Sequence, residues 1–157
     1  GLDTLLDAAE HLARDVPDVT WCVAGDGPLL DETEDEIRRR SLPVRMLGAR
    51  SDVAALLRAA DVVVSTAVWE GQPIAVQEAL GAGAALVVTD AGGTREVTGE
   101  HGAVVVPVGD SAALAHETAA LLVDDTRRAG QGDDAARRSR ELPTSDDVVA
   151  QLLRVYR

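Results

Sequence analysis

Two glutamates eight positions apart, Glu70 and Glu78, are the residues of this chain best suited to ligand chemistry. The aliphatic run 62–64 precedes them, and Pro73 stands between them where a helix can begin, because the first helical amides have no intrahelical partner to lose. The stretch therefore predicts a strand, a loop and a helix. Glu70 lies in the loop, and Glu78, four residues after Ile74, leans back over the first helical turn.

This spacing would place two carboxylates beside the start of one helix. Free amides and the positive end of the helix dipole attract an anion there, most naturally a phosphate. A carboxylate next to a bound phosphate is best used to accept hydrogen bonds from sugar hydroxyls. The residue types thus favour a sugar phosphate or a nucleotide sugar as the ligand.

The same stretch resembles the E-x7-E motif of family-4 retaining glycosyltransferases, because Glu70 and Glu78 enclose Gly71 and Pro73. Other segments follow in the order and spacing of that family's C-terminal, nucleotide-sugar-binding domain, which has the GT-B fold. These segments are Gly25-Asp26-Gly27-Pro28, Met46-Leu47-Gly48, Ala60-Asp61-Val62, Glu78-Ala79-Leu80, Gly83 and Thr89-Asp90-Ala91-Gly92-Gly93-Thr94-Arg95-Glu96-Val97. The resemblance covers essentially the whole chain and implies one donor-binding domain over residues 1–157.

Composition sets further limits. The chain has 157 residues, of which 46% are hydrophobic, and this length and content fit one globular domain. A net charge of -12, with every basic residue an arginine, argues against sequence-independent binding of nucleic acid or of an anionic membrane. Any phosphate site must therefore rely on local amides and a few arginines.

The single cysteine, Cys22, excludes an internal disulfide, and His11, His101 and His116 are too scattered for a metal site. Cys22 falls in an expected strand and is predicted to lie in the core. No apolar run approaches the roughly 20 residues of a membrane span, and no signal peptide is visible. We expect a soluble, cytoplasmic protein without a metal, a cofactor or a transmembrane segment.

Strands and helices alternate along the chain, and each strand is a continuous aliphatic run. This pattern is typical of a parallel sheet covered by helices on both faces, so we predict a doubly wound, Rossmann-like α/β domain. Its strand ends would bring Gly25, Gly48, Glu70 and Gly92 to one rim. Expected strands span 20–24, 44–47, 61–65, 85–88 and 103–106, and expected helices span 1–15, 28–40, 52–59, a stretch beginning at 73, 94–98, 111–122, 125–140 and 144–156.

The resemblance also implies roles for single residues. The family's equivalent of Glu78 accepts hydrogen bonds from the donor ribose, and the equivalent of Glu70 lies beside the donor sugar, which makes Glu70 the candidate catalytic residue. If no ligand binds, Glu78 would be an ordinary exposed helix carboxylate and Glu70 a loop cap. Trp69, next to Glu70, either stacks on a ligand or, as is more usual for a lone aromatic beside a loop, packs against the protein.

Backbone amides around Gly71 hold the diphosphate in the resembling family. Because Pro73 has no amide, that contact would fall on Gln72 and Ile74. The alternative is a plain helix start. The family often carries an aromatic residue at the position of Gln72, so this sequence departs from the pattern there.

Loops at two other strand ends complete the predicted donor site. In relatives the loop at Gly48, Ala49 and Arg50 borders the nucleotide base, and Gly25 and Gly27 lie near the ligand. Ordinary tight turns would explain the same glycines without any ligand.

Two phosphate ligands are expected from outside the sequence. In the family an arginine stands a few residues before the position of Gly1, a lysine stands immediately before it, and the first strand of the domain lies there too. The resemblance therefore implies that this chain lacks that strand, those ligands and the N-terminal acceptor-binding domain, and that it is inactive alone.

The function implied is donor binding in a retaining glycosyltransferase, which transfers a hexose from a nucleotide diphosphate sugar to an acceptor hydroxyl without a metal. The departing diphosphate of an oxocarbenium-like transition state would need electrostatic stabilisation. Two alternatives remain open. One is a noncatalytic nucleotide-sugar-binding module. The other is the C-domain of a nucleotide-sugar epimerase or a phosphorylase, although a phosphorylase would need a lysine-borne cofactor that a chain without lysine cannot hold.

Overall fold

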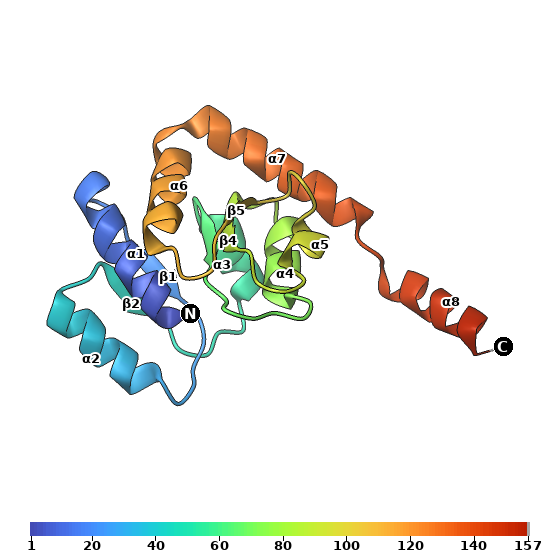
Figure 1. Ribbon diagram of the computed structural model, residues 1–157, viewed down its shortest axis with the longest axis horizontal. Coiled ribbons are helices and arrows are strands. Elements are labelled where there is room, and N and C mark those ends of the chain that lie inside the picture. The colour runs from blue at the N-terminus through green and yellow to red at the C-terminus, as the bar shows by residue number, and fades with distance from the viewer. Residues whose placement is uncertain (157) are drawn as a thin grey trace.

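A computed structural model describes residues 1–156 and shows a helix-rich α/β fold (Figure 1). Arg157, the last residue of the predicted domain, lies outside the described residues. The predicted order of strands and helices is confirmed. The elements are α1 (Leu2–Asp15), β1 (Trp21–Val23), α2 (Leu30–Arg40), β2 (Val44–Met46), α3 (Val53–Ala59), β3 (Val63–Ser65), α4 (Ile74–Gly81), β4 (Leu86–Thr89), α5 (Thr94–Thr98), β5 (Val104–Val106), α6 (Ser111–Val123), α7 (Asp125–Glu141) and α8 (Ser145–Val155).

All strand pairs are parallel, as predicted, and the strands form two sheets. β1 pairs with β2, and β3, β4 and β5 form a second sheet with β4 in the centre. Within residues 1–156 no strand lies between β1 and β3. The doubly wound α/β fold class is correct, and its sheet is interrupted between β1 and β3.

The start of α1 lies between the carboxyl ends of β1 and β3. A Cβ atom placed on Gly1 would be 1.8 Å from the carbonyl oxygen of Thr66, just after β3. Leu2 lines a hollow together with Val23 and Ala24, at the end of β1. Helices of α/β folds begin at the carboxyl end of the strand before them. A strand leading directly into α1 would therefore fit between the two sheets.

Joining a short aliphatic strand and a loop upstream of Gly1 is expected to raise the melting temperature, because the free edges of β1 and β3 would gain backbone partners. The added strand needs about 5 to 6 residues. Thermal melts of the chain and of the extended chain measure the gain. An extension of equal length built from Gly and Ser serves as the control, and equal melting temperatures for the two extensions would contradict the prediction.

Helices cover both faces of the three-stranded sheet, and alternation along the strands divides the core into two clusters. Val87 and Val106 join the cluster beneath α1 and α6, which lie side by side in Figure 1. Leu86 and Val88 face the other way and join the cluster with α4 and α7. The sheet thus fixes α4, the helix that carries Glu78.

The two-stranded sheet is buried on one face only. Trp21 and Val44 are buried, whereas Cys22 and Arg45, their neighbours on the opposite face, are exposed. The prediction that Cys22 lies in the core is therefore wrong. Successive side chains of a strand point to opposite faces. The Trp21 side chain points to the covered face, so that of Cys22 points to solvent.

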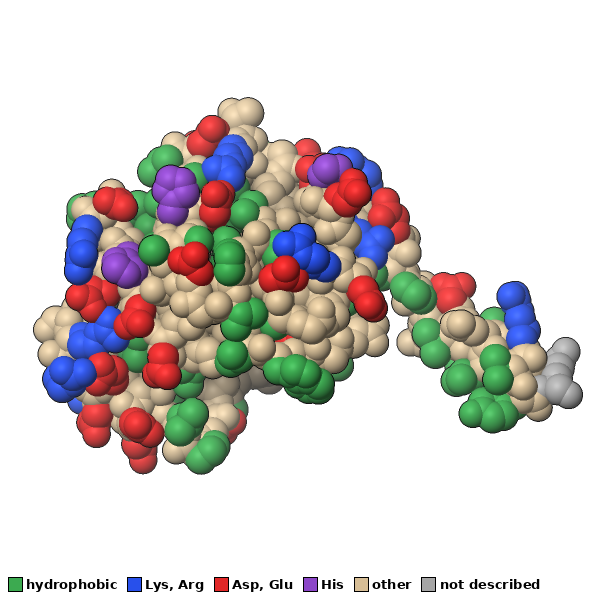
Figure 2. All heavy atoms as spheres, in the orientation of Figure 1, with side chains coloured by type: hydrophobic (Ala, Val, Ile, Leu, Met, Phe, Trp, Pro, Cys, Tyr) green, Lys and Arg blue, Asp and Glu red, His purple; other side chains and the backbone are tan. Residues whose placement is uncertain are grey.

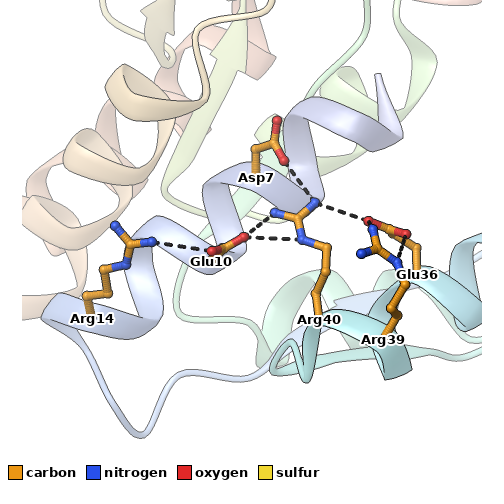
Figure 3. A network of polar contacts seen from close by, with 6 residues as sticks. All are labelled: Asp7, Glu10, Arg14, Glu36, Arg39 and Arg40. Carbon is orange, nitrogen blue, oxygen red and sulfur yellow. Dashed lines mark hydrogen bonds and ion pairs between the residues drawn. The ribbon is translucent and has the colours of Figure 1, made fainter.

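An ion-pair network attaches α2 to α1 (Figure 3). The Arg40 guanidinium lies 2.9 Å from a carboxylate oxygen of Asp7, contacts Glu10 through two nitrogens, and lies 3.6 Å from Glu36. This hydrogen bonding, with the positive charge of Arg40, holds the pKa of Glu10 below its ordinary value of 4.5. In Figure 2 acidic and basic side chains are intermixed over this part of the surface.

Arg40→Met is expected to flatten the dependence of stability on acid pH. A carboxylate with a lowered folded pKa stabilises the fold fully above its unfolded pKa and loses that contribution as the pH falls through the folded value. The difference between wild type and Arg40→Met should therefore be largest near neutral pH and shrink below 4.5, the ordinary value for Glu10. Urea unfolding across this range measures it. Arg154→Met is the control, since Arg154 makes no ion pair within the described part of the chain, and an unchanged slope for Arg40→Met would refute the prediction.

α8 projects away from the other elements (Figures 1 and 2). It starts with a capping box, in which Thr144 and Asp147 exchange hydrogen bonds with each other's backbone at 2.9 and 3.2 Å. An exposed apolar stripe runs along the helix, formed by Val148, Val149, Leu152 and Leu153. No helix in residues 1–156 has the length and apolar character that a membrane crossing requires.

Candidate functional site

The predicted rim is confirmed, and backbone hydrogen bonds join its loops in pairs. The N–H of Gly25, after β1, donates to the carbonyl of Gly48, after β2, at 2.8 Å. The N–H of Gly93, after β4, donates to the carbonyl of Glu70, after β3, at 3.1 Å. Because parallel strands end at the same edge of a sheet, Gly92 lies there too. The candidate site is this carboxyl edge.

The start of α4 offers free backbone amides. The helix begins at Ile74, one residue after Pro73, and no side chain among residues 1–156 caps it. Its first backbone bond runs from the N–H of Gln77 to the carbonyl of Pro73, at 3.1 Å, so the amides before Gln77 have no acceptor within the helix. Ile74 is exposed. These amides and the helix dipole can receive an anion from solvent.

The two predicted carboxylates lie before and after this helix start along the chain. Glu70 is half-buried in the loop before α4, and Glu78 is exposed on α4 itself. Neither side chain accepts a hydrogen bond or forms an ion pair within residues 1–156. Both carboxylates can therefore accept hydrogen bonds from a ligand. Over the same residues, no group of three or more His, Cys, Asp or Glu side chains could hold a metal ion.

Two of the predicted glycines are not required by the fold. Gly27 and Gly71 do not adopt the left-handed backbone region, and a Cβ atom added to Gly27 would meet nothing within 4 Å. On Gly71 the nearest atom would be Cη2 of Trp69 at 3.9 Å, an ordinary van der Waals distance. Neither backbone conformation nor packing explains these glycines. Gly71 and Gln72 are both exposed, which leaves their backbone open to a ligand.

The other two predicted glycines have a conformational explanation. Gly25 has a φ of 138° and Gly48 a φ of 64°, both in the region that favours glycine. Ala49 and Arg50 follow in the exposed loop, and Asp52 holds the Arg50 guanidinium through two hydrogen bonds of 2.8 and 2.7 Å. These bonds raise the pKa of Arg50 and lower that of Asp52. The Arg50 guanidinium is thus bound to Asp52 in this structure.

A hollow of about 320 Å³ lies beside Gly25 and Gly27, and sequence reasoning did not predict it. The local pattern could not reveal it because the walls come from separate elements. Most of its surface is apolar, so it offers few hydrogen-bonding partners. Besides the loop, its lining includes Leu2 from α1, Leu30 and Thr33 from α2, Val23 from β1 and Met46 from β2.

Trp69 does not pack against the protein, contrary to the more usual expectation for a lone aromatic beside a loop. Its side chain is 80% exposed, and Val68 just before it and Ile74 at the start of α4 are 62% and 69% exposed. The strand-end loop that carries Glu70 therefore presents an apolar surface to solvent. Such exposed patches commonly mark contact sites for ligands or partners.

The family model described as "Glycosyl transferases group 1" matches residues 1–124 of the chain. A phosphatidyl-myo-inositol mannosyltransferase of Mycobacterium leprae is 34% identical over 99% of this chain and 42% of its own length. An Anabaena protein, HepE, solved in complex with UDP and glucose, superposes with a TM-score of 0.88 and 25% identity over 99% of this chain and 44% of its own.

The fold matches further solved structures. TarM of S. aureus gives a TM-score of 0.91 over 98% of this chain and 32% of its own, at 21% identity. The chain spans only 23% to 42% of the lengths of the curated relatives that it matches first. These proteins are therefore similar to this chain over part of their length.

Proposed function

Since this chain belongs to the group 1 glycosyl transferases, we propose that it is the donor-binding, C-terminal domain of a retaining hexosyltransferase. The observation that carries the proposal is the start of α4. Glu70 and Glu78, two carboxylates without a partner in residues 1–156, would lie on either side of backbone amides that have no acceptor in the same residues. Anions bind helix starts, and sugar hydroxyls donate to carboxylates. A nucleoside diphosphate sugar carries both groups.

In the proposed reaction the bond between the sugar and the diphosphate breaks, and the acceptor hydroxyl forms the new glycosidic bond with the same anomeric configuration. The hydroxyl proton is released and the nucleoside diphosphate departs. Glu70 fixes the hexose, Glu78 holds the ribose, and the amides of Gln72 and Ile74 stabilise the departing diphosphate. The nucleotide would also contact the loops of Gly25 and Gly48. No metal takes part in this proposal.

An N-terminal domain of the same polypeptide would bind the acceptor, and catalysis would occur between the two domains. The length of the relatives supports this, since the chain spans less than half of each curated protein that it matches first. The transferase would work in the cytoplasm. The nucleotide of the HepE complex makes UDP the first probe to test.

Calorimetric titration of the chain with UDP, GDP and ADP tests the proposed binding role. We expect saturable binding of one of these nucleotides. The absence of binding heat with all three would contradict the proposed binding role. A transfer assay on the chain joined to an N-terminal acceptor domain then separates an enzyme from a noncatalytic module. A product with inverted anomeric configuration would refute the retaining assignment.

A further inference from the structure

The turn that contains Gly92 and Gly93 packs against the loop of Glu70 and Gly71 so closely that only glycine fits. A Cβ atom on Gly92 would lie 1.9 Å from the carbonyl oxygen of Glu70. On Gly93 it would lie 2.0 Å from the carbonyl oxygen of Gly71. Ordinary contacts of this kind begin near 3.4 Å. The double glycine thus lets two backbone segments touch.

Both carbonyl bonds of the loop point at this turn. The Cβ position on Gly92 is 1.9 Å from the Glu70 oxygen and 3.0 Å from its carbonyl carbon. For Gly93 the distances to the Gly71 oxygen and carbon are 2.0 and 3.2 Å. In each case the distance to the carbon exceeds the distance to the oxygen by nearly the length of a C=O bond, about 1.23 Å. Each carbonyl bond therefore lies almost along the line to the turn.

The orientation of the carbonyls fixes the orientation of two amides. In a planar trans peptide the N–H points opposite to the C=O of the same unit. The Glu70 carbonyl shares its unit with the Gly71 amide, and the Gly71 carbonyl shares its unit with the Gln72 amide. Both N–H groups therefore point away from the turn. Neither donates to an acceptor within residues 1–156. Successive free amides directed to one side attract an anion.

We propose that Gly92 and Gly93 are positioning residues, which turn the amides of Gly71 and Gln72 toward the donor diphosphate. This inference rests on the proposed function of the rim. Gly93 is the better residue to test, because its φ of -77° suits any amino acid, so a substitution there acts only through its contact with Gly71. At Gly92, with a φ of 50°, a side chain would also strain the turn itself.

The test compares UDP binding by Gly93→Ala and Gly102→Ala in the whole chain. Gly102 precedes β5, at the opposite edge of the sheet, and a Cβ atom there would lie 2.4 Å from the Thr98 carbonyl oxygen. Both variants should melt at lower temperature. Only Gly93→Ala should weaken UDP binding, by about tenfold or more, as expected when hydrogen bonds to a charged group are lost. Equal UDP affinities for the two variants would overturn the inference.

Amide NMR of the wild-type chain provides a measurement that does not depend on variants folding. Titration with UDP should shift the Gly71 and Gln72 amide signals more than those of Gly102 and its neighbours. Saturable UDP binding without these shifts would overturn the positioning role and leave the binding function standing. If the wild-type chain binds no UDP, the proposed function fails. The positioning role is then decided by a crystal structure of Gly93→Ala, and it is overturned if the Gly71 carbonyl keeps its direction.

Discussion

Glu78→Gln is expected to weaken nucleoside diphosphate binding by about tenfold to a hundredfold, the cost of a hydrogen-bonded contact to a charged group. The carboxylate lies exposed on α4, after the free amides that would hold the phosphates, and in the proposed binding mode the ribose would be one phosphate ester link away. Glutamine keeps the shape but loses the charge and one acceptor. Because Glu78 has no partner within residues 1–156, the melting temperature should not change. Titration and thermal melting measure the two effects.

Glu70→Gln should behave differently. In the proposed binding mode this carboxylate would lie beside the donor sugar. Its loss should then lower turnover of a transferase that contains this domain, and hardly change the affinity for a nucleoside diphosphate that carries no sugar. Glu100→Gln, an exposed change in the loop after α5, is the control for both variants. If sugar-free nucleotide binding depends on Glu70 and not on Glu78, the assignment of the two carboxylates is wrong.

Leu80→Ala is expected to cost about 2 to 5 kcal/mol of unfolding free energy, the usual range for emptying a packed core position. Leu80 is completely buried, in the cluster that joins α4 to the sheet and to α7. Urea unfolding at constant pH measures the loss. Leu153→Ala provides the matched control, because Leu153 on α8 is 53% exposed and its truncation should change little. Similar losses for the two variants would contradict the assigned packing.

Leu80 and Glu78 lie on opposite faces of α4, and their substitutions test the two faces separately. Leu80→Ala removes packing under α4 and leaves the rim residues in place, so the fraction that remains folded should bind nucleotide normally. Glu78→Gln should weaken nucleotide binding and leave the stability of the fold unchanged. The two variants together separate the stability of α4 from its role in binding.

The secondary structure could be predicted closely because its signals are local. The helix expected over 111–122 is α6, Ser111–Val123, and the Asp110 side chain accepts a hydrogen bond from the Ala113 amide at its start. The helix expected over 144–156 is α8, and Thr144 caps its start. Aliphatic runs, capping residues and prolines act within a few positions, so the sequence carries them directly.

Contacts between distant segments could not be predicted in this way. The pairing of β1 with β2, and of β4 with β3 and β5, depends on which strand edges meet, and aliphatic runs do not specify their neighbours. The exposure of Cys22 and Trp69 depends on whether a helix or loop happens to cover them. Burial of this kind is set by tertiary packing.

In the candidate site, too, local features could be predicted and contacts between distant segments could not. Its loops follow from the motif around Glu70, whereas the role of Gly92 and Gly93 becomes visible only when their distances to the Glu70 and Gly71 carbonyls are known. A double glycine in the sequence signals a turn. It does not say which other backbone segment the turn touches.

The gap between the two sheets also bears on folding cooperativity. In the described part of the chain no backbone ladder joins β1 and β2 to the three-stranded sheet, so the two parts are coupled by side-chain packing, chiefly of α1 against α6. Units joined by side chains alone open more independently than units that share a sheet. The amides of β1 and β2 should therefore exchange with solvent earlier than those of β4, which has a strand on each side. The chain would unfold in two stages, and the half that carries Glu70 and Glu78 would be the last to open.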